Sequence, residues 1–208
     1  TPSNSSAASD VYKRQFDTSL IIITADHGEE FWEHGSWEHS HTLFNELLHV
    51  PLLIHLPGQS DQRVITAPVS LLDVMPTLLD LVECAGPQMR GRSLAPLLTE
   101  GGRVPAQFRI FLEACAWGTI RKGLMTERYK LIYDVYHDRF SLYDLQEDPG
   151  ELHDIWGMAR APDTTDLERE LLDWTDRSLS TMASYEQTTR GHLSPEVRRQ
   201  LRDMGYIQ

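Results

Sequence analysis

An apolar segment without alternating polar positions, Leu20–Ile23, is followed within a few residues by Asp26, His27 and Gly28. Its consecutive isoleucines and the nearby glycine favour a central parallel strand covered on both faces over the competing interpretation, a short buried helix. In open α/β sheets, ligands bind outside the carboxyl ends of the strands, where Asp26 and His27 would fall. A carboxylate beside an imidazole suits a divalent cation, although Asp26 can also cap a turn and His27 can be an ordinary loop histidine.

Apolar residues recur with helical spacing in two later segments of the chain. An apolar stripe within residues 43–48 predicts a short helix with Thr42 as its N-cap, and a strand is predicted over residues 52–56. A longer helix is predicted to begin at Asp73 and to end at Gly86–Pro87. The alternation of strands and helices indicates an α/β fold.

The pattern changes after Gly101–Gly102, where short segments rich in aromatic residues begin. Between Phe108 and Leu145 these segments predict three or four antiparallel strands. A helix that begins near Thr165 has an apolar stripe suited to lie on that sheet, and a last helix begins at Ser194. We therefore expect four parts: a leader over residues 1–15, an α/β part over 16–104, an α+β subdomain over 105–185, and a linker with a terminal helix over 186–208.

Composition narrows the class of function. The 208 residues are 40% hydrophobic and 24% charged, as in an ordinary soluble globular chain. A formal net charge of −12 argues against binding to a nucleic-acid backbone, which relies on clustered lysine and arginine. No apolar run approaches the roughly 18 residues that a membrane span needs. The two cysteines indicate neither a disulfide framework nor a zinc module, so the compartment stays open.

Residues 26–58 resemble the carboxyl-terminal signature of the sulfatase family, within the alkaline phosphatase superfamily. The resemblance begins with Asp26-His27-Gly28-Glu29, continues through Glu33-His34-Gly35, and reaches Val50-Pro51 before the next apolar strand. Later segments extend it over most of the chain from Phe16 onward; they are Val69–Leu81, Gly91–Leu98, Tyr129–Ile132 and Leu142–Leu152. It implies an α/β fold: part of an alkaline-phosphatase-like mixed or parallel sheet with flanking helices, plus a small carboxyl-terminal antiparallel sheet with a packed helix.

The resemblance also implies roles for individual residues. Asp26 and His27 would supply one side of a metal site, with calcium the expected ion and manganese or zinc the alternatives. His39 stands where many sulfatases carry a lysine that contacts the sulfate, and an imidazole can hold an anionic oxygen as a hydrogen-bond donor. His39 can equally have another role. His34 and His41 are expected to shape the loop, and contact with a second metal stays open for both.

Two elements of a complete sulfatase are absent from the sequence. Neither Cys84 nor Cys115 lies in the Cys/Ser-x-Pro-x-Arg motif that is converted to the formylglycine nucleophile, and the early pair of aspartates that completes the metal site is not visible. We therefore expect the chain to be the carboxyl-terminal part of a longer enzyme and to be inactive by itself, with formylglycine and any signal peptide upstream. Residues 10–15, DVYKRQ, are interpreted as translated sequencing adapter; a Ser-rich leader is the alternative.

Three hypotheses follow for the function. The first is metal-dependent hydrolysis of a small-molecule or glycan sulfate ester. The second keeps the fold but changes the chemistry to that of a phosphodiester or phosphonate hydrolase or a phosphoethanolamine transferase. The third is a noncatalytic fragment or binding module. The sequence does not determine the oligomeric state.

Overall fold

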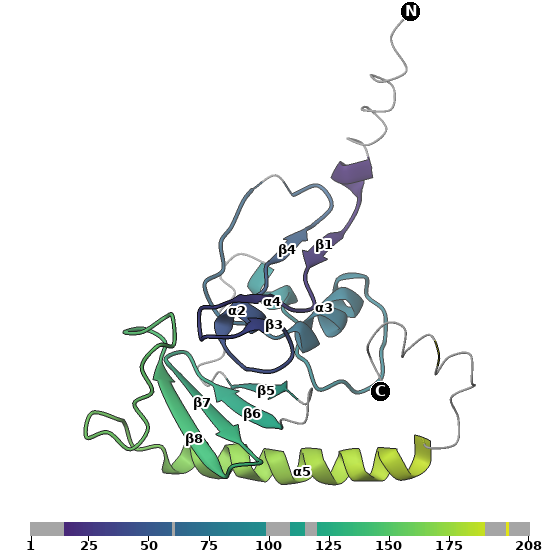
Figure 1. The fold of residues 1–208 in the computed structure, drawn as a ribbon. Coiled ribbons are helices and arrows are strands. Elements are labelled where there is room, and N and C mark those ends of the chain that lie inside the picture. The colour runs from purple at the N-terminus through teal and green to yellow at the C-terminus, as the bar shows by residue number, and fades with distance from the viewer. Residues whose placement is uncertain (1–14, 60, 99–108, 115–119, 190–198, 200–208) are drawn as a thin grey trace, which may run out of the picture. The chain divides into compact units, whose positions relative to one another are not determined.

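A computed structural model describes residues 15–59, 61–98, 109–114, 120–189 and 199 (Figure 1). The chain divides into two compact units between Ala161 and Pro162, and each is described by itself. The leader up to residue 14, the boundary expected at Gly101–Gly102 and the helix expected from Ser194 all lie outside the described residues. The four-part division therefore stays a prediction.

The expected strand after Leu20 is β1 (Ile21–Thr24), which pairs with β4 (Leu52–His55). The pairing is antiparallel and places Ile23 opposite Leu53. Within the described residues, β4 is the strand that pairs with β1, and Ile23 and Leu53 are each 57% exposed, so the expectation of a parallel strand covered on both faces is not met in this chain. Successive side chains of a strand point to opposite faces, and a ribbon of two strands leaves one of those faces uncovered.

A hairpin and a short helix lie between these strands in sequence. The hairpin pairs β2 (Glu30–Phe31) with β3 (Trp37–Glu38), and the helix is α2 (Asn45–Leu48). The prediction of Thr42 as the N-cap was wrong, because the residue at that position is Phe44 and makes no side-chain cap. The backbone N–H of Asn45 instead donates to a carboxylate far away in the sequence, that of Glu151, at 2.7 Å.

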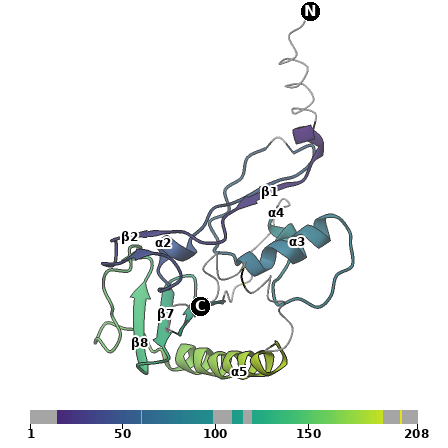
Figure 2. The same ribbon diagram turned by 45° about the vertical axis from the view of Figure 1, so that its right-hand side comes forward.

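The longer predicted helix is present but shorter than expected. A 3₁₀ turn, η1 (Leu71–Asp73), leads into α3 (Val74–Leu81), and α4 (Ala95–Leu98) lies beside α3 (Figure 2). Asp73 precedes α3 as expected, but its side chain forms a capping box with Ser70 across the 3₁₀ turn. The helix ends at Leu81, before the predicted glycine and proline, and the next residue, Val82, is 54% exposed.

The predicted antiparallel sheet is confirmed as four strands in chain order, β5 (Ile110–Ala114), β6 (Arg121–Met125), β7 (Tyr129–Asp134) and β8 (Arg139–Asp144). Its pairing is antiparallel throughout. One face packs against the segment around α2, because Leu43 lies in one buried cluster with Ala114, Ile132 and Tyr143. Phe44 and Leu48 pack against the same cluster. The sheet therefore supports the segment that carries the candidate site.

The second unit contains α5 (Thr165–Thr189), which begins at the predicted residue. The expectation that this helix packs on the sheet stays a prediction. Within the part of the chain that the structure describes, no helix combines the length and the apolar character needed to cross a membrane.

Asp144 at the end of β8 predicts a pH-dependent contribution to stability. Its carboxylate accepts hydrogen bonds from Arg128, from Nη2 at 2.7 Å and from Nε at 3.0 Å. These bonds hold the pKa of Asp144 below its ordinary value, although desolvation opposes them. Because the folded-state pKa is the lower one, the stabilisation is complete above the unfolded-state pKa of about 3.9 and is lost as the pH falls through the folded-state pKa.

We expect Asp144→Asn to lower the free energy of unfolding by about 1–2 kcal/mol at neutral pH and by less in acid. Urea unfolding of both proteins at pH 7 and at pH 3 measures the difference. A difference of the same size at the two pH values would contradict the assignment.

Candidate functional site

Asp26 and His27 lie directly after β1, at the position predicted from the sequence. The side chain of Asp26 is 89% exposed and that of His27 is 44% exposed. The Nδ1 of His27 lies 2.8 Å from the carbonyl oxygen of Gly28, which can only accept, so Nδ1 donates this bond and Nε2 is the ring nitrogen left to bind a metal ion. That Nε2 lies 3.8 Å from Oδ1 of Asp26. An oxygen and a nitrogen donor at this separation fit one divalent cation, with the second ring nitrogen oriented by a carbonyl as metal-binding histidines require.

His39, the third predicted site residue, is in contact with His27. The two imidazole rings stack with centroids 4.1 Å apart and an angle of 18° between their planes. On its other side His39 directs Nδ1 toward the carboxylate of Glu29, at 3.3 Å. The structure therefore brings all three predicted residues together at one partly exposed place.

Gly28 holds the segment of Asp26 and His27 close to α2. Its backbone N–H donates to the carbonyl oxygen of Leu47 at 2.8 Å. A Cβ at position 28 would overlap the carbonyl oxygen of Glu46, so only glycine lets the two backbones come this close. The residue after the candidate metal ligands is thus anchored directly to α2.

A buried carboxylate, that of Glu30, organises the loop between the hairpin strands. Its side chain is 0% exposed. Oε1 accepts the backbone N–H groups of His34 at 3.2 Å and Ser36 at 2.9 Å, and Oε2 lies 2.9 Å from Nε2 of His41. We call these four residues the Glu30 network. Its bonds satisfy both oxygens of a carboxylate that would otherwise be costly to bury.

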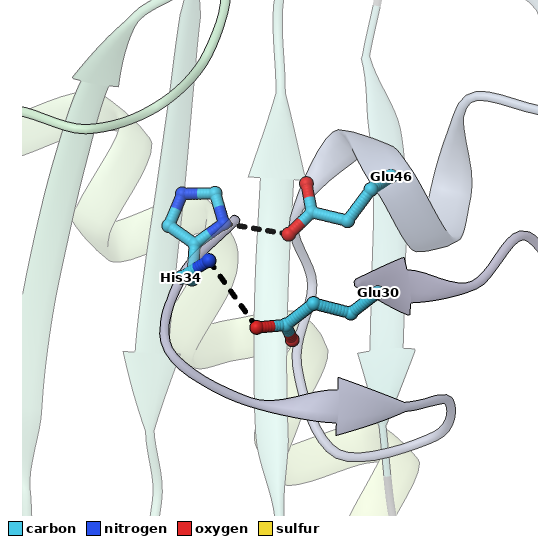
Figure 3. Close-up of side chains that lie close together, drawn as sticks. All are labelled: Glu30, His34 and Glu46. Carbon is cyan, nitrogen blue, oxygen red and sulfur yellow. Dashed lines mark hydrogen bonds and ion pairs between the residues drawn. The ribbon is translucent and has the colours of Figure 1, made fainter. Parts of the chain in front are cut away.

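His34 joins this network to α2 (Figure 3). Its Nδ1 lies 2.6 Å from Oε1 of Glu46, and its Nε2 lies 3.1 Å from the carbonyl oxygen of Glu151. Glu30, His34 and Glu46 offer ligand atoms within 4.8 Å of one another, a spacing that a metal ion can bridge. In the structure these side chains bond to one another and to the backbone of the hairpin loop, and the loop-shaping role of His34 and His41 stays a prediction, as does contact with a second metal.

A buried ion pair, formed by Lys130 and Glu151, contacts the first residue of α2. Nζ of Lys130 on β7 is 2.7 Å from Oε1 of Glu151, and both side chains are 0% exposed. Burial lowers the pKa of Lys130, and the charge of Glu151 opposes that change. Sequence reasoning gave these two residues no role, although each is a charged residue inside a segment that carries the family resemblance, YKLI and DPGEL.

Comparison with known proteins identifies relatives over most of the chain. Residues 32–177 match the protein family described as N-sulphoglucosamine sulphohydrolase, C-terminal. The chain is 29% identical over 174 residues to an N-acetylglucosamine-6-O-sulfatase of Bacteroides thetaiotaomicron, covering 78% of this chain and 31% of that protein. It is 32% identical over 167 residues to arylsulfatase K of Bos taurus, covering 74% of this chain and 30% of that protein.

Among solved structures, the phosphonate monoester hydrolase of Silicibacter pomeroyi superimposes with a TM-score of 0.67 at 30% identity. The match covers 83% of this chain and 38% of that one. The predicted fold class, an α/β fold of alkaline-phosphatase type with a small antiparallel sheet, is thereby confirmed. The chain spans about a third of the length of the curated relatives it matches.

Proposed function

We propose that this chain, which belongs to the sulfatase family, forms part of a metal-dependent enzyme that hydrolyses sulfate esters. The observation that carries the proposal is the convergence of Asp26, His27 and His39, since the rings of His27 and His39 stack at 4.1 Å. A pair of metal donors beside an anion contact is the arrangement that a sulfate ester requires.

Each of the three residues has a separate task in this proposal. When bound, the divalent ion supplies positive charge that stabilises the sulfuryl oxygens in the transition state. Asp26 and His27 would hold the ion through a carboxylate oxygen and an imidazole nitrogen. His39 donates a hydrogen bond to a sulfuryl oxygen, and Glu29 restrains its ring by holding Nδ1. Because the overall charge of −12 repels an anionic ester at long range, these local groups must hold the substrate.

The finer assignments belong to the same proposal. We propose calcium as the ion, as the resemblance to the sulfatase family implies, with manganese or zinc as the alternatives that the imidazole nitrogen of His27 favours on ligand softness alone. The formylglycine nucleophile and the remaining metal ligands are proposed to come from outside this chain. A sulfated amino sugar is the proposed substrate class, supported by the resemblance to an N-acetylglucosamine-6-O-sulfatase.

The test uses the complete gene product, obtained by long-read sequencing of the source locus across the junction between Gln15 and Phe16. We expect a Cys/Ser-x-Pro-x-Arg motif upstream, and calcium-dependent hydrolysis of 4-nitrophenyl sulfate that EDTA abolishes. The same assay on the 208-residue chain alone is expected to show no turnover. A reading frame that starts near Phe16, together with no hydrolysis of any ester, would favour a noncatalytic binding module and reject the proposal.

A second candidate, hydrolysis of phosphonate or phosphate esters, is favoured by the likeness to the phosphonate monoester hydrolase, at 30% identity. The histidine at position 39, where the resemblance leads one to expect lysine, is compatible with either anion. Parallel assays with 4-nitrophenyl sulfate and 4-nitrophenyl phenylphosphonate separate the two. A higher kcat/KM for the phosphonate would transfer the proposal to phosphoryl chemistry.

A further inference from the structure

The ion pair of Lys130 and Glu151 lies outside the candidate site and within the protein interior. Both side chains are 0% exposed, and Nζ and Oε1 are 2.7 Å apart. Burying two opposite charges is unfavourable unless the geometry is good and their remaining hydrogen-bonding capacity is used. The partners that use this capacity therefore indicate what the pair does.

Those partners all lie in the loop that carries the candidate site or in α2. Lys130 Nζ donates to the carbonyl oxygen of Leu43 at 3.0 Å and to Oδ1 of Asn45 at 2.8 Å. Glu151 accepts the backbone N–H of Asn45 through Oε2 at 2.7 Å. The backbone carbonyl of Glu151 lies 3.1 Å from Nε2 of His34. The two residues thus hold the first turn of α2 and the hairpin loop together.

The backbone of Glu151 supports the same interpretation. Its φ is +54°, in the left-handed region that non-glycine residues seldom adopt. Such a conformation persists where surrounding contacts over-determine it. Here it lets one residue present both its carboxylate and its carbonyl oxygen to α2 and His34.

From α2 the contacts continue to the candidate metal ligands. Glu46 on α2 pairs with His34, and the carbonyl oxygen of Leu47 accepts the N–H of Gly28 at 2.8 Å. Gly28 directly follows His27 and accepts a hydrogen bond from its Nδ1. A displacement of α2 is therefore transmitted to the ring of His27 through a single residue, Gly28.

We propose that Lys130 and Glu151 are positioning residues: they hold α2 in the place that orients His27 in the candidate site. The consequence for the reaction rests on the proposed function, whereas the positioning itself does not. The hydrogen bonds of Lys130 and Glu151 run to Leu43, Asn45 and His34, so their effect on His27 passes through α2 and Gly28.

The test compares Lys130→Met and Glu151→Gln with a matched control, Lys122→Met. Lys122 is also 0% exposed and paired with a glutamate, Glu113, but the register of β6 and β7 places it on the opposite face of the sheet from Lys130. Imidazole signals of His27 and His34 in the 208-residue chain are followed by NMR. We expect both sets to shift in the two positioning variants and to stay in place in Lys122→Met.

A double variant, Lys130→Met with Glu151→Leu, separates positioning from simple stabilisation. Replacing both charges by apolar groups is expected to recover part of the unfolding midpoint lost in the single variants, because no buried charge is left alone, although the N–H of Asn45 still lacks its acceptor. The His27 and His34 signals are expected to stay displaced, because the bonds to Leu43 and Asn45 are still missing. Wild-type signals in this folded double variant would overturn the proposal, and so would equal shifts in Lys122→Met.

In the complete enzyme, the same double variant is expected to lower kcat/KM about tenfold or more, since small displacements of reacting groups are costly. If the wild-type enzyme hydrolyses no sulfate ester, the proposed function fails, but the NMR comparison still decides whether Lys130 and Glu151 position His27. If the wild type is active and the folded double variant equals it in kcat/KM, the positioning proposal fails while the proposed function stands.

Discussion

Asp26→Asn is expected to lower kcat/KM of the complete enzyme for a sulfate ester by about 10³-fold or more. The amide keeps the shape of the carboxylate but removes the negative charge that holds the divalent ion. Loss of several kcal/mol of charge stabilisation at the transition state corresponds to this factor. The stability of the protein should change little, because the side chain is 89% exposed. Initial rates against 4-nitrophenyl sulfate, at calcium concentrations from micromolar to millimolar, provide the measurement.

The matched control for this variant is Asp17→Asn. Asp17 is also exposed and belongs to the same compact unit, but it lies before β1, at the opposite end of that strand from Asp26. This control removes one negative charge from the surface and is expected to leave kcat/KM within about twofold, because exposed charges at a distance are screened by salt. Equal activity of Asp26→Asn and Asp17→Asn at every calcium concentration would exclude Asp26 as a metal ligand.

The predictable part of the fold consists of elements with a local signature. Short segments rich in aromatic residues between Phe108 and Leu145 predicted three or four antiparallel strands, and the sheet has four. The apolar run at Leu20–Ile23 likewise specified a strand. Such a run does not determine the direction of the neighbouring strand, and the pairing of β1 with β4 proved to be antiparallel.

In the candidate site, too, features set by neighbouring residues could be predicted, and contacts between residues far apart in the sequence could not. Asp26 and His27 are adjacent to a strand end, so their position could be predicted from neighbours in the sequence. The contacts that hold α2 could not, because Glu151 bonds to Asn45 and to His34 across 106 and 117 residues respectively. The same distant carboxylate explains the error at Thr42: it binds the first N–H of α2, so no local cap is needed.

Glu30 is a third kind of residue: its partners are near in the sequence, but its burial could not be predicted. It is a charged residue beside the exposed Phe31, and the alternation around it gave no sign that its carboxylate is buried. The reason for its burial is visible only once the hairpin has formed, because the N–H groups of His34 and Ser36 then converge on Oε1. A carboxylate that replaces water for several backbone donors stabilises a loop that has too few residues to form a core of its own.

We therefore expect Glu30→Leu to lower the free energy of unfolding by about 3 kcal/mol or more. The leucine fills the buried space but leaves two backbone N–H groups and the Nε2 of His41 without an acceptor. Each unsatisfied buried donor costs about 1–3 kcal/mol. Glu30→Gln keeps one acceptor oxygen for the two N–H groups and loses only the charge near His41, so its expected loss is about 1–2 kcal/mol.

Glu38 provides the control for this series, because it is the cross-strand partner of Glu30 in the hairpin and its side chain is exposed. Glu38→Gln should change the free energy of unfolding by less than about 0.5 kcal/mol. Urea unfolding of the four proteins gives the order: wild type and Glu38→Gln together, then Glu30→Gln, then Glu30→Leu. If Glu30→Leu were as stable as wild type, the buried carboxylate would not hold the loop.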